Sequence, residues 1–524
     1  MKTLQQKAMA FAEKNAYDDA AKCFEQILHH DPNRVDALLN AGLMHYYAGR
    51  YQFAEQFVLA GIAKDSQSPD AYYYLGLIYT ATNHPKGAIN CYHRAVILAP
   101  QYEMAWYNLG SLFFDQKEYD AAISCYKKVL EINPNCFDAG LNIGESYARI
   151  EQFEKAIQCF KKLVLTHPNS PDVHYNMGVA YNGLRQYRDA IAAYDRALAI
   201  DAGHVKSHYN KSFILLLHGD YINGFAEYEW RLKQPKTYQS VSIKPRWQGN
   251  PIPNQTLFMY AEQGFGDCIQ YIRFLPMIRE RVGRLILECQ PELTRLFSGL
   301  KYIDLLIPRG SPLPAHDYQA SLLSMGYLMK ITLQNLPQYM PYLTPTTPLS
   351  DRVRQTIHKK SGQPKIGIVW GGTGSTEMKT DMGRSMRLQE CLTLFEMKNI
   401  QWFSFQKGAR AKELNALTDD QLIDLGKYCA DFADTAAAAS QMDLIITIDT
   451  AMAHLAGALG LPVWVLLSYD ADWRWLLNIR DNPWYPGMRV FRQLQPGHWR
   501  NVLIAVQTAL KKLIEKNWNI VCMR

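Results

Sequence analysis

The chain has 524 residues, 48% of them hydrophobic and 20% charged, and a formal net charge of +7, which predicts a globular protein of about three domains. The basic residues are dispersed among acidic ones, which argues against a nucleic-acid-binding stripe, and no segment has the roughly 18 apolar residues that a membrane span needs. The ten cysteines form no CxxC pair and the amino terminus has no apolar signal core, so we expect a reducing, cytoplasmic location.

A period of 34 residues runs through the first half of the chain. Small residues and aromatic residues recur in fixed registers, which lets paired helices approach and fills the space between them. The small residues are Gly42, Gly76, Gly110, Gly144 and Gly178 in one register, and Ala20, Ala54, Ala88, Ala122, Ala156 and Ala190 in another. This pattern resembles the tetratricopeptide repeat, so residues 1–235 are predicted to form an α-solenoid.

An amide side chain occupies a further register of the repeats. The residues are Asn40, Asn108, Asn142, Asn176 and Asn210. By resemblance to tetratricopeptide arrays, this position lies on the first helix of each repeat and faces the concave groove. An amide offers both donors and an acceptor, and the row resembles the amide ladder in the repeats of O-linked N-acetylglucosamine transferases. It predicts a groove for an acceptor polypeptide; the alternative is that the amides satisfy neighbouring helix ends.

Residues 236–255 are rich in proline, glutamine and lysine and are predicted to be a linker. Residues 256–345 then begin an α/β region with a strand at Thr256–Tyr260. A loop with Gly264 and Gly266 follows, and glycines there let the backbone approach a ligand. No third glycine completes a dinucleotide-binding fingerprint. Asp267 starts the next helix and is either its cap or a catalytic carboxylate.

Residues 360–524 are predicted to form a second α/β region. Its first strand, Lys365–Trp370, leads into a loop that contains Gly371 and Arg384, and a later strand ends next to Lys407. Glycines and basic residues at the ends of strands suit a phosphate-binding loop.

The segment Asp443–Leu467 has the pattern of a strand, an acidic turn, a helix and a second strand. Thr450 is a good cap for a helix that starts at Ala451, and His454 lies one turn into it. Because ligands bind beyond the carboxyl ends of parallel strands, Asp449, Thr450 and His454 are predicted to meet a nucleotide. The alternative is an ordinary strand–helix–strand unit with a capping threonine and a core histidine.

Together these motifs carry a resemblance to a known family. The sequences EQGFGD, VWGG, DMGRS, FQKG, DTAMAHLAGALG and DWRW follow one another between Trp247 and the carboxyl terminus. Their order resembles glycosyltransferase family 9, the heptosyltransferases, in a branch fused to tetratricopeptide repeats. The resemblance implies the GT-B fold, which consists of two Rossmann-like halves.

The resemblance also implies roles for individual residues. Asp267 is expected to be the base that activates the acceptor, and the turn of Asp449, Thr450, Ala451 and His454 is expected to grip the nucleotide. Gly264, Gly266 and Gly371 are expected to border the donor. The candidates for the positive charge near its diphosphate are Lys407, Arg384 and Arg387.

No metal site and no cofactor are expected besides the nucleotide-diphosphate sugar donor. The pair Asp470 and Asp472 mimics the metal-binding DxD motif of another glycosyltransferase fold, but it lies in the DWRW element and away from the predicted sugar-nucleotide turn.

The sequence therefore predicts a cytoplasmic, metal-independent glycosyltransferase that modifies a protein captured by the repeats. The alternatives are a heptosyltransferase-like enzyme that acts on lipopolysaccharide or another glycan, and a non-catalytic repeat scaffold.

Overall fold

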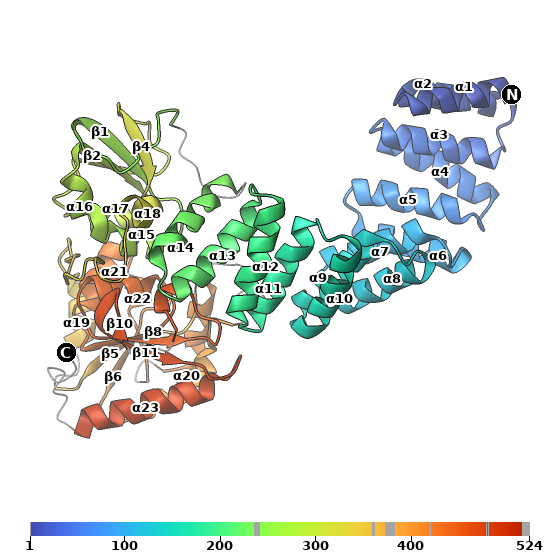
Figure 1. Cartoon of the computed structure of the whole chain (residues 1–524). Coiled ribbons are helices and arrows are strands. Elements are labelled where there is room, and N and C mark those ends of the chain that lie inside the picture. Colours follow the sequence, from blue (N-terminus) through green and yellow to red (C-terminus); the bar gives the residue numbers. More distant parts are fainter. Residues whose placement is uncertain are drawn as a thin grey trace. The chain divides into compact units, whose positions relative to one another are not determined.

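A computed structural model describes residues 2–234, 242–358, 362–372, 383–418, 421–477, 479 and 481–515. The chain folds into two compact units, Met1–Ser207 and His208–Arg524, whose elements are labelled in Figure 1. Residues 373–382, which belong to the predicted phosphate-binding loop, and residues 235–241, at the start of the predicted linker, lie outside the described ranges.

The first unit is a stack of helix pairs (Figure 1). Its helices are α1 (Lys2–Glu13), α2 (Tyr17–His30), α3 (Val35–Tyr47), α4 (Tyr51–Lys64), α5 (Pro69–Ala81), α6 (Pro85–Leu98), α7 (Glu103–Asp115), α8 (Tyr119–Ile132), α9 (Phe137–Arg149), α10 (Phe153–Thr166), α11 (Pro171–Gly183) and α12 (Tyr187–Ile200). The first helices of successive pairs begin 34 residues apart, as the period predicts; their first residues are Val35, Pro69, Glu103, Phe137 and Pro171. Helix α13 (Val205–Leu217) spans the boundary between the two units.

Glycine and aromatic residues join the two helices of a pair. A Cβ atom added to Gly76 would lie 2.5 Å from the ring of Tyr92, and one added to Gly144 would lie 2.3 Å from the ring of Phe160. Such distances are too short for a real contact, so only glycine lets these rings pack against the first helix. The predicted roles of the recurring glycines and aromatic residues are confirmed at these positions.

The second unit contains two mainly parallel sheets covered by helices. Sheet A has the strand order β3-β2-β1-β4 and sheet B the order β10-β11-β9-β8-β5-β6-β7, and β10 and β11 pair antiparallel. The strands are β1 (Ile252–Tyr260), β2 (Val282–Cys289), β3 (Leu305–Pro308), β4 (Tyr318–Ser321), β5 (Lys365–Val369), β6 (Gln401–Ser404), β7 (Ile423–Asp424), β8 (Leu444–Ile448), β9 (Val463–Leu467), β10 (Asp481–Asn482) and β11 (Tyr485–Arg492). This arrangement is an α/β fold, as predicted.

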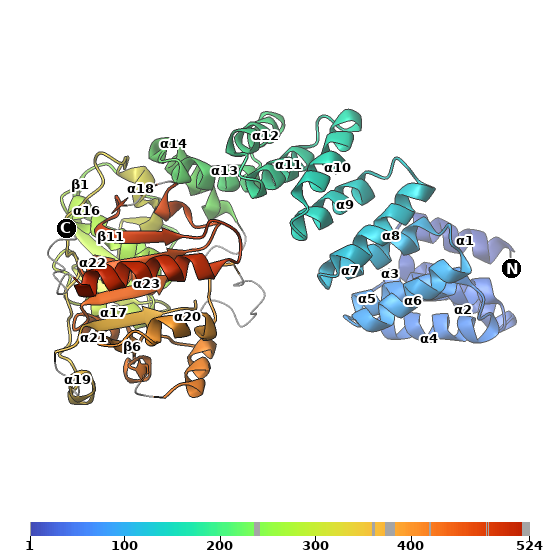
Figure 2. The same ribbon diagram turned by 90° about the horizontal axis from the view of Figure 1, so that it is seen from below.

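The helices of the second unit connect or cover these strands. The α-helices are α14 (Tyr221–Tyr228), α15 (Phe265–Tyr271), α16 (Leu275–Arg279), α17 (Pro291–Phe297), α18 (Met325–Leu328), α19 (Asp351–His358), α20 (Leu388–Phe395), α21 (Phe432–Ala439), α22 (Ala451–Ala458) and α23 (Trp499–Glu515). The short 3₁₀ segments are η1 (Glu229–Lys233), η2 (Ile272–Phe274), η3 (Leu322–Ser324), η4 (Ala409–Ala416), η5 (Gly426–Tyr428) and η6 (Trp473–Trp475). Figure 2 shows α23 in front of the strands of sheet B.

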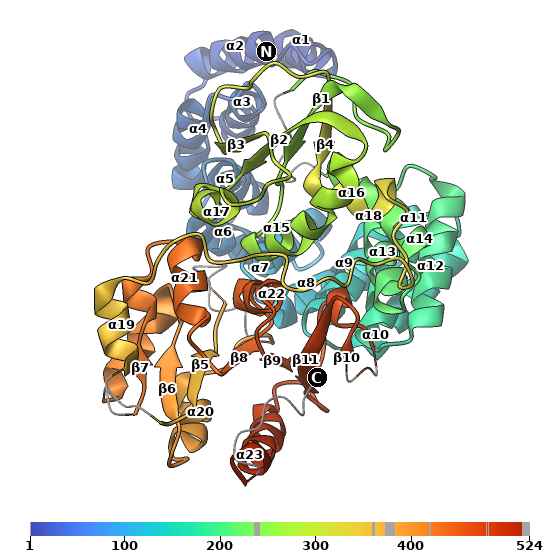
Figure 3. The same cartoon turned by 90° about the vertical axis from the view of Figure 1, so that its left-hand side faces the viewer.

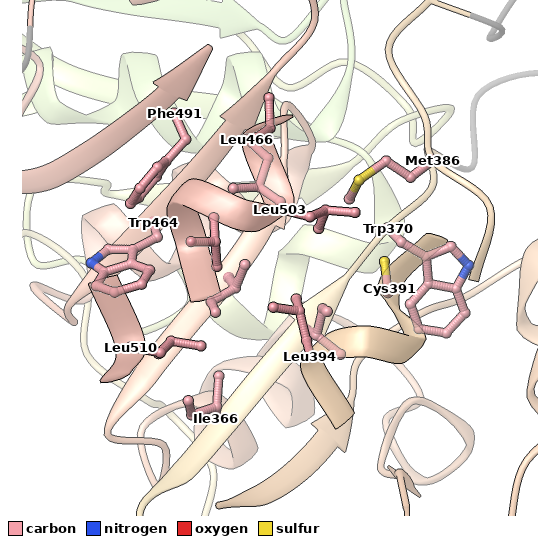
Figure 4. Packing of buried hydrophobic residues seen from close by; sticks show 14 of the residues in the cluster. Ile366, Trp370, Met386, Cys391, Leu394, Trp464, Leu466, Phe491, Leu503 and Leu510 are labelled. Atoms are coloured by element: carbon pink, nitrogen blue, oxygen red, sulfur yellow. The ribbon is translucent and has the colours of Figure 1, made fainter. Parts of the chain in front are cut away.

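Helix α23 helps to form the hydrophobic core of sheet B. An apolar stripe on this helix is buried against strand residues such as Trp464, Leu466 and Phe491 (Figure 4). The stripe consists of Trp499, Val502, Val506, Leu510 and Leu513. Leu510 of the stripe and Ile366 of β5 belong to the same cluster. The strands β5, β8 and β9 are thereby held side by side, with their carboxyl ends at one edge of the sheet.

Part of the expected linker belongs to sheet A. Strand β1 begins at Ile252 instead of the expected Thr256, and Arg246 forms an isolated parallel bridge with Gln319 of β4. Trp247 is buried, and its indole N–H donates to the carbonyl oxygen of Asn250 at 2.7 Å. The sequence did not predict this extension, because prolines in the segment argue against a strand.

The last repeat is built into the second unit. In η1, Arg231 is buried and donates to Glu262 at 2.6 Å and to Ser321 at 3.2 Å, both at the ends of sheet A strands. In α14, Phe225 packs on Gly326, where an added Cβ atom would lie 2.6 Å from its ring. These contacts place α14 and η1 with the α/β fold, whereas the sequence assigned residues up to 235 to the repeat array.

Candidate functional site

The predicted ligand-binding residues follow the carboxyl ends of several strands. Gly371 comes after β5, Lys407 after β6 and Asp449 directly after β8. These strands are neighbours in sheet B, in the order β8-β5-β6. Since they are parallel, their carboxyl ends share one edge, which is where α/β proteins bind ligands.

Helices from the two sheets meet at this edge. Helix α15 follows β1 of sheet A, α22 follows β8 of sheet B, and the two helices contact each other (Figure 3). A Cβ atom on Gly266 would lie 2.8 Å from the His454 ring and 3.3 Å from the Cα atom of Ala451. Gly266 is therefore required for the close approach of the two helices, and the sequence had assigned it only to a ligand.

Asp267 lies in the first turn of α15 and takes part in two interactions. Its Oδ2 accepts a hydrogen bond from the backbone N–H of Gly264 at 3.1 Å, and its Oδ1 accepts one from Arg474 at 2.5 Å. Burial raises the pKa of the Asp267 carboxyl, and the Arg474 guanidinium opposes that rise. One carboxylate oxygen of Asp267 therefore caps the start of α15, and the other pairs with the Arg474 cation.

Arg474 is the residue that the sequence interpretation missed. It lies in η6 and donates to Asp267 and Asp472, and its Nε donates to Gln270 of α15 at 2.7 Å. Its guanidinium also lies over the Trp473 ring, 4.4 Å from the centroid. An arginine between two tryptophans in the DWRW motif was a signal for a fixed cation, since aromatic rings hold guanidinium groups.

Asp449 is a buried carboxylate at the start of α22. Burial and the neighbouring charge of Asp472 raise its pKa to about 6, and Arg384 opposes the rise. Thr450 caps the helix as predicted, with its Oγ1 accepting from the N–H of Met452 at 3.3 Å. The second carboxylate of this site therefore holds its proton to a higher pH than an ordinary aspartate does.

His454 is held inside the same cluster. Its Nδ1 lies 2.8 Å from the hydroxyl of Tyr485, and its ring stacks on Trp475 with centroids 5.5 Å apart. Burial, together with the charges of Arg474 and other arginines, lowers its pKa well below the ordinary value. The imidazole is therefore neutral at neutral pH, which suits a hydrogen-bonding role and not that of a cation.

The remaining predicted donor residues have different surroundings. Arg384 is exposed, and its positive charge lowers the pKa of Asp267, Asp449 and His454. Lys407 instead donates to the backbone carbonyl of Cys429. Gly371 is fixed by the side chain of Gln406, which accepts from its N–H at 2.8 Å and donates to its carbonyl at 2.9 Å.

The carboxylate of Asp472 is engaged by Arg474, with Nη1 2.8 Å from Oδ1. Across the described ranges, no three His, Cys, Asp or Glu side chains come together as a metal-binding group. The described helices also include none that is long and apolar enough to cross a membrane.

The recurring amides of the first unit connect neighbouring repeats. Asn108 donates to the hydroxyl of Tyr73 at 3.3 Å, and Asn142 donates to Tyr107 at the same distance. Asn176 donates to Glu145 at 2.7 Å, and Asn40 donates to the carbonyl of Asp36 in its own helix. In three repeats the amide nitrogen thus joins adjacent first helices, a role that the period alone did not predict.

Comparisons with known proteins identify the repeats. The tetratricopeptide repeat family matches residues 6–69, 69–102, 104–136, 138–170 and 171–204. The predicted repeat class of the first unit is therefore confirmed, and such repeats serve as surfaces for binding other proteins.

One curated relative is Protein FlbA of Caulobacter vibrioides (strain ATCC 19089 / CIP 103742 / CB 15). It is 24% identical over 329 residues, which cover 57% of this chain and 54% of FlbA. The chain thus spans about half the length of this relative.

Similar solved structures include YrrB, a tetratricopeptide repeat protein with an unusual peptide-binding site, and MamA. YrrB is 21% identical, with 36% of this chain and 98% of YrrB covered and a TM-score of 0.35. MamA is 27% identical, with 32% of this chain and 92% of MamA covered and a TM-score of 0.30.

Proposed function

We propose that this protein is a glycosyltransferase of the GT-B type, which transfers a sugar from a nucleotide-diphosphate sugar to a hydroxyl group of a polypeptide. The α/β unit would perform the transfer and the repeats would bind the acceptor. The observation that carries the proposal is the cluster of Asp267, Asp449 and Arg474 at the junction of two parallel sheets. Ligands are bound at such strand ends in α/β folds.

Asp267 has the properties of the catalytic base in this proposal. Burial raises its proton affinity above that of an ordinary aspartate, and Arg474 keeps it ionised and fixed in direction. In the transfer step the acceptor oxygen forms a bond to the anomeric carbon and its proton passes to Asp267. The bond between that carbon and the phosphate oxygen breaks, and the nucleoside diphosphate leaves with the electron pair.

The leaving diphosphate requires positive charge and hydrogen-bond donors. The amino-terminal turn of α22 offers backbone N–H groups behind Thr450, and the exposed Arg384 adds a positive charge that acts on the neighbouring Asp449. Lys407 contributes only if it leaves the carbonyl of Cys429 when the donor binds. Arg384 is therefore the first cation to test.

The repeats support a polypeptide acceptor. Tetratricopeptide arrays present extended surfaces to protein partners, and Asn108 and Asn142 use their amide nitrogens toward tyrosine hydroxyls, which leaves their Oδ1 atoms for a bound backbone N–H. An enzyme acting on a glycan would make no use of that row. A non-catalytic scaffold is the second candidate, because the family match covers the repeats.

The experiment is a donor screen followed by an Asp267→Asn test. Thermal unfolding is measured with a panel of nucleotide-diphosphate sugars, and a true donor raises the midpoint by mass action. Incorporation of radiolabelled sugar into protein is then compared between the wild type and Asp267→Asn. The variant should lose roughly 100-fold in transfer, the size of a general-base contribution, and keep its donor affinity.

Exposed Asp351→Asn in α19 is the matched control and should transfer at the wild-type rate. Wild-type transfer by Asp267→Asn would refute the role of Asp267. If no donor stabilises the protein and no sugar is incorporated, the scaffold replaces the transferase. Incorporation into a lipid or glycan fraction alone would support the heptosyltransferase-like alternative.

A further inference from the structure

A cavity of about 730 Å³ opens in the first unit between α8, α9 and α10. Apolar side chains such as Phe137, Ile143 and Leu163 line its inside. Its charged lining residues are Lys127, Lys155 and Lys162, and none of its described lining residues is acidic. A volume of this size is typical of ligand-binding pockets.

The cavity has a cause in the sequence of the repeats. Gly140 lines it, and the same register position carries a large side chain in the other repeats. These are Leu38, Tyr72, Trp106, His174 and His208. Gly140 alone in this register contributes no side chain, so the space beside α9 stays open.

The counterparts of Gly140 show what this space accommodates. The Trp106 indole N–H donates to the carbonyl oxygen of Pro100 at 3.0 Å, six residues earlier in the chain. The Nε2 atom of His174 lies 3.0 Å from the carbonyl oxygen of Pro168, again six residues earlier. The Tyr72 hydroxyl donates to the carbonyl oxygen of Ser66 at 3.4 Å. Six residues before Gly140 stands Pro134, which also lines the cavity. The cavity therefore matches a flat polar ring that reaches a backbone carbonyl.

The lysines at this cavity are arranged around its aromatic wall. The Lys127 and Lys155 ammonium groups lie 5.7 and 5.5 Å from the centroid of the Tyr147 ring. Lys162 and Lys127 both bring positive charge to the thiol of Cys159, whose pKa burial raises and these charges lower. Three cations without a lining carboxylate favour an acidic ligand.

The cavity is separate from the amide row of the array. Residues of α9 advance by about 100° each, so Asn142 lies about 200° around the helix from Gly140. Asn142 donates to Tyr107 of the preceding repeat, whereas Gly140, Ile143 and Tyr147 face the cavity. A ligand in the cavity would leave the amide row unoccupied.

We propose that this cavity binds an acidic peptide segment of a partner protein through one inserted tryptophan or tyrosine side chain. The inserted ring takes the place that Trp106 fills in the preceding repeat, and its N–H or O–H donates to the carbonyl of Pro134. Carboxylates on either side of the ring meet Lys127, Lys155 and Lys162. This site does not depend on the transferase activity of the second unit.

The probe is a fluorescein-labelled peptide of eight acidic residues around one central tryptophan, and its binding to the full chain is measured by fluorescence anisotropy. Gly140→Trp fills the cavity with the chain's own ring and should weaken binding at least tenfold. Gly140→Ala is the matched control, because a Cβ atom there meets only the flexible end of Leu163 at 3.0 Å and leaves most of the cavity open. Its binding should stay within about twofold of the wild type.

A second variant removes the charges and leaves the cavity open. Lys127→Gln, Lys155→Gln and Lys162→Gln are combined, and they should weaken binding at least tenfold and flatten its dependence on salt. Lys161→Gln is the control, because Lys161 is exposed on α10 next to Lys162 and does not line the cavity. Circular dichroism checks the fold of each variant, and if Gly140→Trp fails to fold, the triple variant decides.

Two further probes test the chemistry of the ligand. A peptide with alanine in place of the tryptophan should bind at least tenfold more weakly, and a peptide with lysines in place of the acidic residues should not bind. The proposal is overturned if the acidic tryptophan peptide does not bind. Equal binding of the alanine peptide, or wild-type affinity in folded Gly140→Trp or in the triple variant, would overturn it as well.

Discussion

Replacing Arg231 by methionine should strongly destabilise the second unit. The side chain is buried and donates to Glu262 and Glu229, each at 2.6 Å, and to two serine hydroxyls. Methionine fills part of the volume but leaves the buried Glu262 carboxylate without its cation. Breaking a buried pair from one side costs about 3–5 kcal/mol, so we expect that loss in the free energy of unfolding.

The loss should depend on pH with a definite sign. Burial already raises the pKa of Glu262, and Arg231 opposes that rise. Without Arg231 the folded-state pKa rises further above the unfolded value. The native state then holds a proton that the unfolded state releases, so stability falls as pH increases between the two pKa values. Arg231→Met should therefore be more destabilised at pH 7 than at pH 4.5.

The assay is urea unfolding followed by tryptophan fluorescence. Of the 11 tryptophans, only Trp106 belongs to the first unit, so the signal reports on the second. Arg354→Met is the control, because the Arg354 side chain is 56% exposed in its pair with Asp351 and such pairs contribute about 0–1 kcal/mol. The double variant Arg231→Met with Glu262→Gln should recover part of the loss. A loss below about 1 kcal/mol in Arg231→Met at pH 7 would refute the reasoning.

Three more predictions concern the site and the repeats. In Arg474→Met the pKa of Asp267 should rise, so the acidic limb of the pH–rate profile for sugar transfer should move to higher pH. Arg474→Lys keeps a cation and should reverse part of this shift, and an unmoved limb in Arg474→Met would contradict the pairing. Burial raises the pKa of Asp449 to about 6 in the folded protein, so the free energy of unfolding should decrease as the pH rises from about 4 to about 6. Asp449→Asn has no titrating group at this position, so in urea unfolding its decrease should be smaller by up to roughly 3 kcal/mol. Asn142→Ala should lower the stability of the first unit by about 0.5–1.5 kcal/mol in thermal unfolding followed by circular dichroism, and an unchanged midpoint would show that its bond to Tyr107 is not needed.

Helix propensity alone leads to the opposite expectation for these asparagines. Alanine is a better helix former than asparagine, which predicts an array that tolerates replacement of the amides. The structure adds the bonds from Asn108 and Asn142 to tyrosines of the preceding repeat. Helix propensity acts within one helix, whereas these bonds join two helices. The sequence period therefore could not show the stability that is lost when the bonds are removed.

The sequence by itself determined the elements that depend on near neighbours. The 34-residue period predicted where helices such as α9 and α11 begin, and the residues before Ala451 predicted the cap of α22 by Thr450. The strand that the pattern of Asp443–Leu467 predicts at its start is β8 (Leu444–Ile448). Hydrophobic period, capping and turn chemistry are local signals, and they were sufficient here.

Only the tertiary structure decided which side chains meet. Arg474 and Asp267 are 207 residues apart and are joined because the turns after β9 and β1 meet at the junction of the two sheets. Arg231 reaches Ser324 across 93 residues, and Lys407 donates to a backbone carbonyl instead of pointing to the turn that was predicted to bind a nucleotide. Strand order and helix packing set such distances. This packing results from the burial of apolar surface across the whole unit, so a local pattern of residues cannot predict it.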